Sequence, residues 1–343
     1  MTIHVGLIGG GNISETHARA AREVPGLEIA AVFGTNRERV SQLAAEFRAR
    51  PFDDFTQFLA HRPMDFVAIG SPSGLHAEQG IAAARSGLHV LAEKPLDINV
   101  AQTDALIAAT RDAGVKLGVF FQDRFKTDLM QVKKWMEAGS LGKLILADAR
   151  VKWFRAESYY GDSRWRGTLR LDGGGALINQ AIHTVDLLLW MCGEVSAVEA
   201  VRRTELHKIE AEDTLAAILE FRGGAIGTLL ATTSVYPGYP RRVELTGTEG
   251  TVIIEHDRLL AADLRHPPEG FRSTGNDQNA SAFSATVSDV RGHRAVLEDF
   301  VHAIETDTTP RCSGAEGRSS VALVEAIYQA CATRKRVELN VGK

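Results

Sequence analysis

The stretch HVGLIGGGNIS, residues 4–14, decides the fold class of this chain. A short apolar run leads into three glycines, and a segment with helical periodicity follows at once. Gly9 and Gly11 fit the first two positions of a dinucleotide-binding turn, where the backbone bends tightly and approaches a pyrophosphate. Ser14 takes the third position, where a small residue lets the helix lie close to the strand, and the helix N-terminal amides face phosphates. A glycine-rich surface turn is the alternative, so the rest of the chain has to decide.

Strand and helix patterns alternate regularly after this turn. Buried-type strands are predicted at 27–33, 65–70, 88–92 and 116–121, and helices at 36–47, 74–86, 100–113 and 126–138. Repeated βα units of this length predict a parallel, doubly wound sheet that binds ligands at the carboxyl ends of its strands. This context favours the dinucleotide site over the surface turn.

The end of the second strand bears on the choice of dinucleotide. The residues there are Gly34-Thr35-Asn36-Arg37-Glu38-Arg39, with no carboxylate at the strand end. Nothing at that point repels a 2′-phosphate, and Thr35, Asn36 and Arg37 or Arg39 are able to hydrogen-bond it. The pattern favours NADP over NAD, whereas an ordinary polar loop capping the next helix is the alternative.

Two further strand ends carry polar residues. Ser71-Pro72-Ser73 follows the strand at 65–70, with His76 one turn into the next helix, and Glu93-Lys94-Pro95 follows the strand at 88–92. A lysine at the mouth of a buried strand is placed to reach a substrate oxygen, although most lysines only solvate a surface. The residues expected to contact the dinucleotide are Gly9, Gly11, Asn12, Ile13, Thr35, Asn36, Arg39, Ser71, Pro72, His76, Glu93, Lys94 and Gln122.

The stretch DGGGALINQAIHTVD, residues 172–186, predicts a helix that begins directly after three glycines. Asn179, His183 and Asp186 recur at i, i+4 and i+7 and so share one helix face. The apolar side comprises Leu177, Ile178, Ile182, Val185 and Leu188. Because buried polar groups are costly unless satisfied, a core helix with this polar stripe predicts a substrate site.

Five aromatic residues fall between 153 and 165, in a chain that is 7% aromatic overall, and arginines 155, 164, 166 and 170 are interleaved with them. Such a pattern can stack nucleic-acid bases, but the net charge of −4 disfavours that partner. Aromatic faces also pack on sugars, and arginines bind hydroxyls, carboxylates or phosphates. Trp165 and Arg166 are expected nearest the substrate, with Tyr160 as a further candidate.

Two other segments supply substrate candidates. Gln122-Asp123-Arg124-Phe125 follows the last strand of the first sheet, so Arg124 either binds substrate or locks the domain junction. The turn Tyr236-Pro237-Gly238-Tyr239-Pro240 is rigid, and Tyr236 is expected to close the pocket from the far side.

Composition bounds the class of protein. A chain of 343 residues is expected to form two domains. The sequence contains no run of 18 apolar residues, which a membrane-spanning helix would need. The N-terminal residues are predicted to form a strand, and no signal sequence is recognised there. The three scattered cysteines have neither the pattern of the disulfides of a secreted fold nor the spacing of a zinc site. A cytoplasmic protein with no membrane, nucleic-acid or metal partner is expected.

The second half is rich in β-structure. Strands are predicted at 144–151, 195–202, 214–221, 225–233, 242–246 and 250–255, helices at 291–305 and 317–334, and a loop at 273–288. The short glycine-containing turns between these strands are typical of a mostly antiparallel sheet.

The motifs GLIGGGNI, SPSGLH, AEKPL and GGGALINQAIHTVDLL, in this order and spacing, resemble the Gfo/Idh/MocA family of NAD(P)-dependent sugar and polyol oxidoreductases. The resemblance covers essentially the whole chain. It implies a Rossmann domain at 1–121 and a C-terminal α/β substrate domain at 122–343, whose large sheet has one open face. That face commonly serves oligomerisation, so a homodimer or homotetramer is expected.

The resemblance also implies catalytic roles. His183 matches the family's acid/base, and Lys94 matches the lysine that donates a hydrogen bond to the same substrate oxygen. Many relatives have aspartate four residues before the histidine, where this chain has Asn179. A neutral amide is able to orient His183 but cannot stabilise an imidazolium by charge. Asp186 either fills that role in part or caps the domain interface instead.

The function expected is hydride transfer between a nicotinamide and a secondary hydroxyl of a sugar or glycoside, with C3 as the expected position. A nucleotide-sugar 3-dehydrogenase of the UDP-N-acetylhexosaminuronate type is the alternative enzyme, because the arginine-rich segment suits a diphosphate or carboxylate. An NAD(P)-binding regulator without catalysis is the alternative of another class; loss of Lys94 or His183 would mark it, and both are present.

Overall fold

The computed structural model describes residues 2–266 and 289–339. The chain forms two compact units, Met1–Gln122 with Thr286–Val321, and Asp123–Ala285 with Ala322–Lys343. The chain therefore returns to the first unit after building most of the second, which a division into two consecutive segments does not anticipate.

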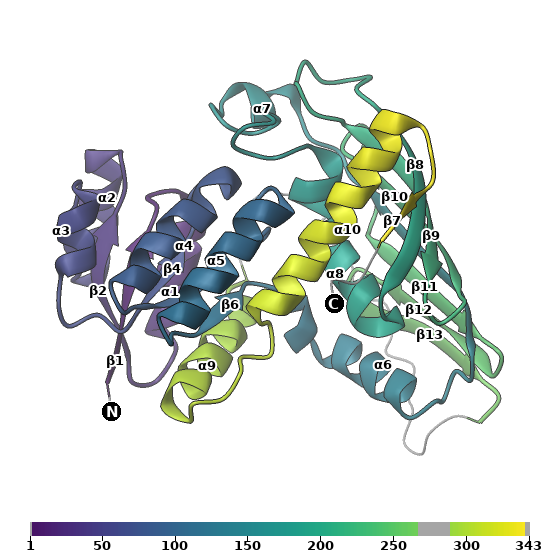
Figure 1. The fold of residues 1–343 in the computed structure, drawn as a ribbon, viewed down its shortest axis with the longest axis horizontal. Coiled ribbons are helices and arrows are strands. Elements are labelled where there is room, and N and C mark those ends of the chain that lie inside the picture. Colours follow the sequence, from purple (N-terminus) through teal and green to yellow (C-terminus); the bar gives the residue numbers. More distant parts are fainter. Residues whose placement is uncertain (1, 267–288, 340–343) are drawn as a thin grey trace. The chain divides into compact units, whose positions relative to one another are not determined.

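The first unit contains a six-stranded, fully parallel sheet in the order β3-β2-β1-β4-β5-β6 (Figure 1). Its strands are β1 (Ile3–Ile8), β2 (Leu27–Phe33), β3 (Arg50–Phe52), β4 (Phe66–Ile69), β5 (His89–Ala92) and β6 (Leu117–Val119). This is the strand order of a doubly wound nucleotide-binding fold, in which the order reverses between β1 and β4. The predicted fold class of this half is confirmed.

Helices connect and cover these strands. They are α1 (Asn12–Arg22), α2 (Arg37–Phe47), α3 (Phe55–Ala60), the short η1 (Ser73–Leu75), α4 (His76–Arg85), α5 (Val100–Asp112) and α9 (Arg291–Glu305). Helix α1 packs against α9, and α4 packs against α5. Gly80 makes the second contact possible, because a Cβ there would lie 2.6 Å from Leu106 Cδ1.

The second unit contains an eight-stranded sheet in the order β13-β12-β11-β7-β10-β9-β8-β14. Its strands are β7 (Leu144–Lys152), β8 (Val195–Arg203), β9 (Thr214–Phe221), β10 (Ile226–Thr232), β11 (Arg242–Gly247), β12 (Gly250–Glu255), β13 (Arg258–Leu264) and β14 (Val337–Glu338). Among the described strands of this sheet, only β7 and β10 pair in parallel, so the prediction of a mostly antiparallel sheet is confirmed.

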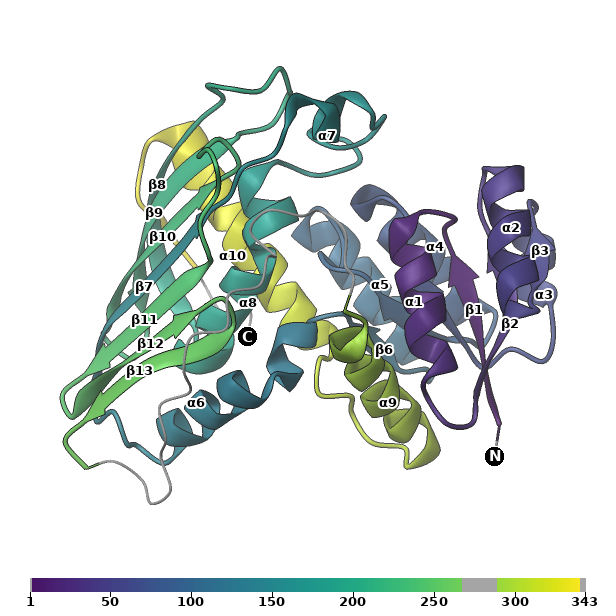
Figure 2. The ribbon, with the colours of Figure 1, turned by 180° about the vertical axis from the view of Figure 1, so that it is seen from behind.

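One face of the eight-stranded sheet is covered by helices and the other is open. The helical segments are η2 (Gln122–Phe125), α6 (Thr127–Glu137), α7 (Glu157–Gly161), the π-helix η3 (Ala176–Ala181), α8 (Ile182–Cys192) and α10 (Gly314–Thr333). Helix α8 packs on β7 and α6 on β13 (Figure 2). Strand β9 shows the open face most clearly: its residues alternate between buried ones and exposed ones, which are Ala216, Ile218 and Glu220.

The predicted elements agree with the structure at most positions. The bounds 27–33, 214–221, 250–255 and 291–305 are reproduced without change. Strands β3 and β14 and the short helices α3 and α7 were missed, because segments this short carry little periodicity. The longer strand β13 was missed as well, and its residues do not alternate regularly between buried and exposed. The loop predicted at 273–288 lies outside the described residues.

The prediction of one regular α-helix after the glycines of residues 173–175 is wrong. The segment begins as the π-helix η3 and becomes α-helical only at Ile182. Its apolar side is nevertheless correct, because all five predicted residues are fully buried. Among the residues that the structure describes, no helix is both long and apolar enough to cross a membrane.

Candidate active site

The glycine turn between β1 and α1 has the geometry of a phosphate site. Gly9 has a φ of +122°, and a Cβ there would lie 2.6 Å from Ser14 Oγ and 2.7 Å from the Gly70 carbonyl oxygen, so only glycine fits. Gly11 is the N-cap of α1 without a side-chain cap, and no described atom lies within 4 Å of its Cβ position. The start of α1 therefore has no side-chain cap and has open space beside Gly11, which fits a dinucleotide pyrophosphate bound by the first amides of the helix.

The residues after β2 divide into two groups. Asn36 is the N-cap of α2, and its side chain accepts a hydrogen bond from the Arg39 amide at 3.1 Å. Arg37 forms an ion pair with Asp53. Thr35 and Arg39 are exposed, and Arg39 Cβ lies 3.7 Å from the Cβ position of Gly10. Of the polar groups predicted here, Thr35 and Arg39 are thus the ones best placed to contact a ribose 2′-substituent.

The loops after β4 and β5 are tied together by His76. Its buried ring has Nδ1 at 2.8 Å from the Pro95 carbonyl oxygen and Nε2 at 2.9 Å from the Ser71 carbonyl oxygen. Asp97, also buried, accepts hydrogen bonds from the amide of Ala77 at the start of α4 and from that of Ile98. Both ring nitrogens of His76 face backbone carbonyls, which favours a role in fixing these loops over direct cofactor contact.

Lys94 is half-buried at the carboxyl end of β5, between buried Glu93 and buried Pro95. The Glu93 carboxylate lies 2.9 Å from His17 Nε2 and accepts a hydrogen bond from the Lys94 amide at 3.2 Å. The strand-end position predicted for this lysine is confirmed.

Glu212 holds the start of the segment that contains His183. Its carboxylate accepts hydrogen bonds from the amides of Gly175 (3.2 Å) and Leu177 (2.9 Å) and from the Tyr328 hydroxyl (3.0 Å), while its own carbonyl accepts from the Ala176 amide (2.9 Å). Burial raises the pKa of Glu212. The sequence offered one weak signal for this residue, an acidic pair directly before a strand, and the prediction missed it.

Glycine is required where this segment meets Glu212. A Cβ on Gly175 would collide with the Glu212 carbonyl oxygen, and one on Gly174 would collide with the Tyr328 hydroxyl. The two glycines therefore allow this segment to pack closely against Glu212 and Tyr328. The chain continues from them as a π-turn, a feature found often at functional sites.

Asn179 lies in the π-turn and is held from both ends of its amide. Its Nδ2 donates to Asp172 Oδ1 at 2.5 Å, and its Oδ1 accepts from Gln180 Nε2 at 2.5 Å and from the Tyr159 hydroxyl at 3.4 Å. Asp172 is 1% exposed, and its other oxygen accepts from the Gly167 amide at 2.8 Å. Since Asp172 already supplies a carboxylate, an amide at position 179 is the electrostatically compatible neighbour.

Arg124 and Asp186 form a bidentate ion pair with distances of 2.9 and 2.7 Å. Their side chains are 3% and 1% exposed, and the Arg124 guanidinium also lies 5.6 Å from the centre of the Trp190 ring. Each charge neutralises the other in the interior, which favours a structural role for both over contact with substrate. The pair joins η2 to α8 one turn beyond His183.

His183 is half-buried at the start of α8 and lies within electrostatic reach of a second carboxylate that the prediction did not consider. Asp123 is buried and paired with Arg241 at 2.7 Å and with Lys126 at 2.6 Å. Burial opposes ionisation of Asp123, but the charges of Arg241, Lys126 and His183 hold its pKa well below the usual range. An ionised carboxylate therefore faces His183 from η2.

Part of the aromatic and basic segment at 153–170 gathers around Tyr159. Tyr159 lies between Arg155 and Arg166, whose guanidinium carbons are 5.5 and 4.2 Å from its ring centre. Arg155 is buried and donates to Gln180 Oε1 at 2.7 Å. Trp165 and Arg166 are half-buried.

The two tyrosines predicted as substrate contacts differ in their surroundings. Tyr160 is buried, its hydroxyl lies 3.0 Å from Thr233 Oγ1, and burial raises its pKa. These contacts favour a core role. Tyr236 is 78% exposed and packs edge-on against Phe154, so it is available to a ligand.

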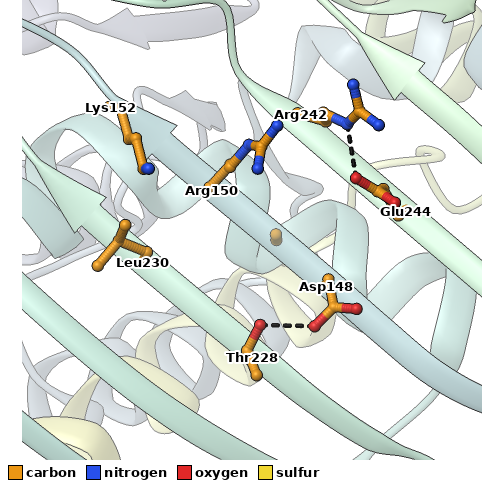
Figure 3. Close-up of a pocket in the computed structure, with 8 residues that line it drawn as sticks. Asp148, Arg150, Lys152, Thr228, Leu230, Arg242 and Glu244 are labelled. Carbon is orange, nitrogen blue, oxygen red and sulfur yellow. Dashed lines mark hydrogen bonds and ion pairs between the residues drawn. The ribbon is translucent and has the colours of Figure 1, made fainter.

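A separate depression of about 370 Å³ lies on the open face of the eight-stranded sheet (Figure 3). Arg150 of β7 is directly opposite Arg242 of β11, and Arg242 binds Glu244 at 2.6 Å. Asp148 accepts a hydrogen bond from Thr228 at 2.6 Å. Both signs of charge are therefore displayed on this face.

Comparison with known families agrees with this geometry. A model of the oxidoreductase family with an NAD-binding Rossmann fold matches residues 3–121, and a model of the GFO/IDH/MocA C-terminal domain matches residues 129–253. The chain belongs to the Gfo/Idh/MocA family. The predicted family and enzyme class are thereby confirmed: the members it matches are oxidoreductases and dehydrogenases of sugars and polyols.

Three relatives illustrate the range within the family. The structure of the WlbA dehydrogenase from Bordetella pertussis with NADH and UDP-GlcNAcA superposes with a TM-score of 0.91, at 32% identity over all of both chains. The Chromobacterium violaceum WlbA structure with the same two ligands has a TM-score of 0.90, at 28% identity over 100% of this chain and 97% of that one. Levoglucosan dehydrogenase of Pseudarthrobacter phenanthrenivorans is 26% identical over 94% of this chain and 87% of its own length.

Proposed function

We propose that this family member oxidises a secondary hydroxyl, the one at C3, of a UDP-linked N-acetylhexosaminuronate. The supporting observation is the chain-long similarity, at 32% identity, to a dehydrogenase whose structure holds NADH and UDP-GlcNAcA. The exposed Arg164 and Arg170 and the half-buried Arg166 provide guanidinium groups of the kind that bind carboxylate and diphosphate. A simple glycoside is the second candidate, favoured by the similarity to levoglucosan dehydrogenase.

His183 is the proposed acid/base. An imidazole is the side chain best suited to exchange protons near neutral pH, and the ionised Asp123 favours the protonated form that results when the substrate hydroxyl loses its proton. Bound nicotinamide would accept the hydride from the carbinol carbon.

Lys94 is the proposed polarising group for the reacting oxygen. A protonated amine that is fixed at a strand end donates a hydrogen bond and stabilises negative charge as it develops. Its backbone is held by Glu93 and by the loops that His76 joins.

The remaining site residues divide into contacting and positioning groups. Trp165, Arg166 and Tyr236 are proposed to contact substrate. Asn179, Arg124, Asp186 and Tyr160 are proposed to act through their neighbours, because hydrogen bonds or ion pairs within the protein engage their polar groups.

For the dinucleotide we propose a preference for NADP. No carboxylate stands at the end of β2, and Arg39 is exposed beside the glycine turn. A guanidinium there is suited to a 2′-phosphate. The glycine turn itself, with open space at the N-terminus of α1, fits either dinucleotide.

We further propose that the open face of the eight-stranded sheet forms the contact between copies in a homodimer or homotetramer. Exposed Leu146, Val201, Ile218 and Ile226 lie on its strands, beside the oppositely charged groups of Figure 3. A face with apolar residues and both signs of charge can complement itself across a twofold axis. The three free cysteines suit the reducing cytoplasm, where we expect the enzyme to work.

The test is a turnover panel with purified protein. NADP and NAD are each offered with UDP-N-acetylhexosaminuronates, the matching UDP-hexosamines without the carboxylate, and free glycosides, and reduced cofactor is followed by absorbance. We expect the uronates to have the highest kcat/KM. Preference for free glycosides would replace the first candidate by the second, and tight cofactor binding without turnover of any sugar would reject both.

A further inference from the structure

Three buried side chains of the first unit meet beneath the loop that carries Lys94. His17 comes from α1, Glu93 from the end of β5 and His293 from α9. Glu93 Oε1 lies 2.9 Å from His17 Nε2 and 3.6 Å from His293 Nε2. The side chains of His17, Glu93 and His293 are 0%, 8% and 3% exposed. Two imidazoles therefore face one oxygen of a buried carboxylate.

The other oxygen of Glu93 points to the reactive loop. Oε2 accepts a hydrogen bond from the Lys94 backbone amide at 3.2 Å. One buried carboxylate thus connects the two imidazoles to the backbone at Lys94.

Aromatic packing fixes the imidazoles in turn. The His17 ring stacks on Phe120 with centres 4.3 Å apart, and the His293 ring lies 5.6 Å from the same phenyl group. Gly292 lets α9 lie close to Gln122, because a Cβ at position 292 would be only 3.1 Å from Gln122 Cβ. His293, about 200 residues beyond Lys94 in the chain, is brought there by the return of the chain to the first unit.

Electrostatics agree with an ionised carboxylate in this cluster. Burial alone would raise the pKa of Glu93, but hydrogen bonds and charge from His17 and His293 hold it well below its usual range. Burial lowers the pKa of His17. A charged carboxylate in the interior is stable only with compensating partners. Loss of one imidazole should therefore disturb Glu93 and the Lys94 backbone amide that Glu93 holds.

We propose that His17, Glu93 and His293 form a positioning cluster for Lys94, with His293 as a residue of α9 that tunes the reaction without touching substrate. The inference rests on the proposed dehydrogenase function, in which Lys94 polarises the reacting oxygen. The geometry that carries it is a carboxylate shared between two imidazoles and the Lys94 amide.

The first experiment compares three variants of the full-length protein. His293→Leu removes the polar partner, His293→Gln keeps a hydrogen-bond donor, and His302→Leu changes an exposed histidine of the same helix as a control. We expect His293→Leu to lower kcat about tenfold, with the dinucleotide Kd and the substrate KM changed less than threefold, and His293→Gln to recover most of the loss. A merely structural role would lower the melting temperature and weaken cofactor binding together, with no recovery by glutamine.

The second measurement needs no substrate, so it separates this proposal from the proposed function. Reductive methylation of Lys94 is followed by mass spectrometry in the wild type, in Glu93→Gln and in His293→Leu, with exposed Lys143 as internal reference. We expect the labelling rate of Lys94 relative to Lys143 to change at least threefold in both variants. If no sugar is oxidised, the proposed function fails while this measurement still decides the positioning.

Two results would overturn the proposal. One is unchanged labelling and, where turnover is measurable, unchanged kcat in His293→Leu. The other is one equivalent of tightly bound metal in the purified protein that is lost in His293→Leu, since the three side chains also have the separations of a metal-binding group. Ligation would then replace the hydrogen bonds inferred here.

Discussion

The two units support their proposed catalytic residues in different ways. Lys94 follows a buried parallel strand, and its backbone is held by an ionised carboxylate between imidazoles. His183 follows a π-turn that is held by neutral amides and by the buried carboxylates of Asp172 and Glu212. The first support is a charged cluster in an aromatic core, and the second is a network of hydrogen bonds around an irregular helix start.

The difference shows what each support has to accomplish. A strand end is already rigid, because parallel neighbours fix it on both sides, so only the direction of the next few residues remains to be set. A helix start leaves four amides without helical partners, and those amides need acceptors from elsewhere in the chain. In this protein Glu212, 29 residues after His183, accepts from three amides of this segment: its carboxylate accepts from Gly175 and Leu177, and its carbonyl accepts from Ala176.

The largest effect should come from removing the proposed catalytic group of either unit. His183→Ala deletes the acid/base and Lys94→Met deletes the polarising charge at similar volume. Each should lower kcat by about 10²-fold or more, because both groups act on charge that develops in the transition state. Steady-state kinetics on the best substrate of the panel measure the loss, and fluorescence titration with reduced cofactor should give a Kd within threefold of wild type. Near-normal turnover in either variant would contradict its role.

A charge swap in the second unit should have the next largest effect. Asn179→Asp places a second carboxylate 2.5 Å from Asp172, and two carboxylates at that distance cannot both ionise. Asp172→Asn removes the charge that anchors Asn179. Each single variant should lower kcat about tenfold, since the π-turn before His183 loses a hydrogen bond or gains repulsion. Kinetics at a pH near 7.5 measure both.

The double variant Asp172→Asn with Asn179→Asp provides the control. The amide introduced at position 172 can donate to the carboxylate introduced at position 179, while its oxygen still accepts from the Gly167 amide. Gln180 and Tyr159 still donate to position 179. Recovery of at least a third of wild-type kcat is therefore expected. A double variant no better than the product of the two single losses would show that the two residues act independently.

The fold and the first unit of this protein could be predicted largely from sequence, for a physical reason. Glycines at a strand-to-helix turn and a lysine at a strand end are local features, because the turn, its strand and its helix are adjacent in the chain. Gly9 and Gly11 lie in the turn between β1 and α1, and the following strand β2 has the predicted bounds. Family membership followed from the same motifs in their order.

The support of the second site could not be predicted, because its partners are distant in sequence. No feature of the sequence around His183 indicates that Asp123 or Glu212 interacts with this segment. The i, i+4, i+7 rule also assumes a rotation of 100° per residue, which a π-turn does not keep. Asp186 illustrates the same limit: its spacing suggested a ligand contact, but Arg124, 62 residues earlier, occupies it.

A smaller effect, on cofactor choice, is expected in the first unit. Arg39→Ala should weaken NADPH binding about fivefold to tenfold and leave NADH binding within twofold, because only the 2′-phosphate needs the guanidinium. Fluorescence titration of both reduced cofactors gives the two Kd values. Arg37→Ala is the matched control, since Arg37 is engaged by Asp53 and should change neither. Tighter binding of NADH than NADPH by the wild type would reject the proposed preference.

The smallest effect on catalysis should follow from a change on the open face of the second unit. Ile218→Arg places a charge at a 52% exposed position on β9, next to Thr228 of β10, and should shift the oligomer toward smaller species in light scattering coupled to size exclusion. Leu206→Arg, at a 54% exposed position outside the strands, is the control. Since the face opposite the helices carries none of the proposed catalytic groups, kcat should change less than threefold even where the assembly is lost. An assembly unaltered by Ile218→Arg would place the contact elsewhere, whereas a large fall in kcat would mean that assembly itself holds the helix of His183 in place through the sheet on which α8 packs.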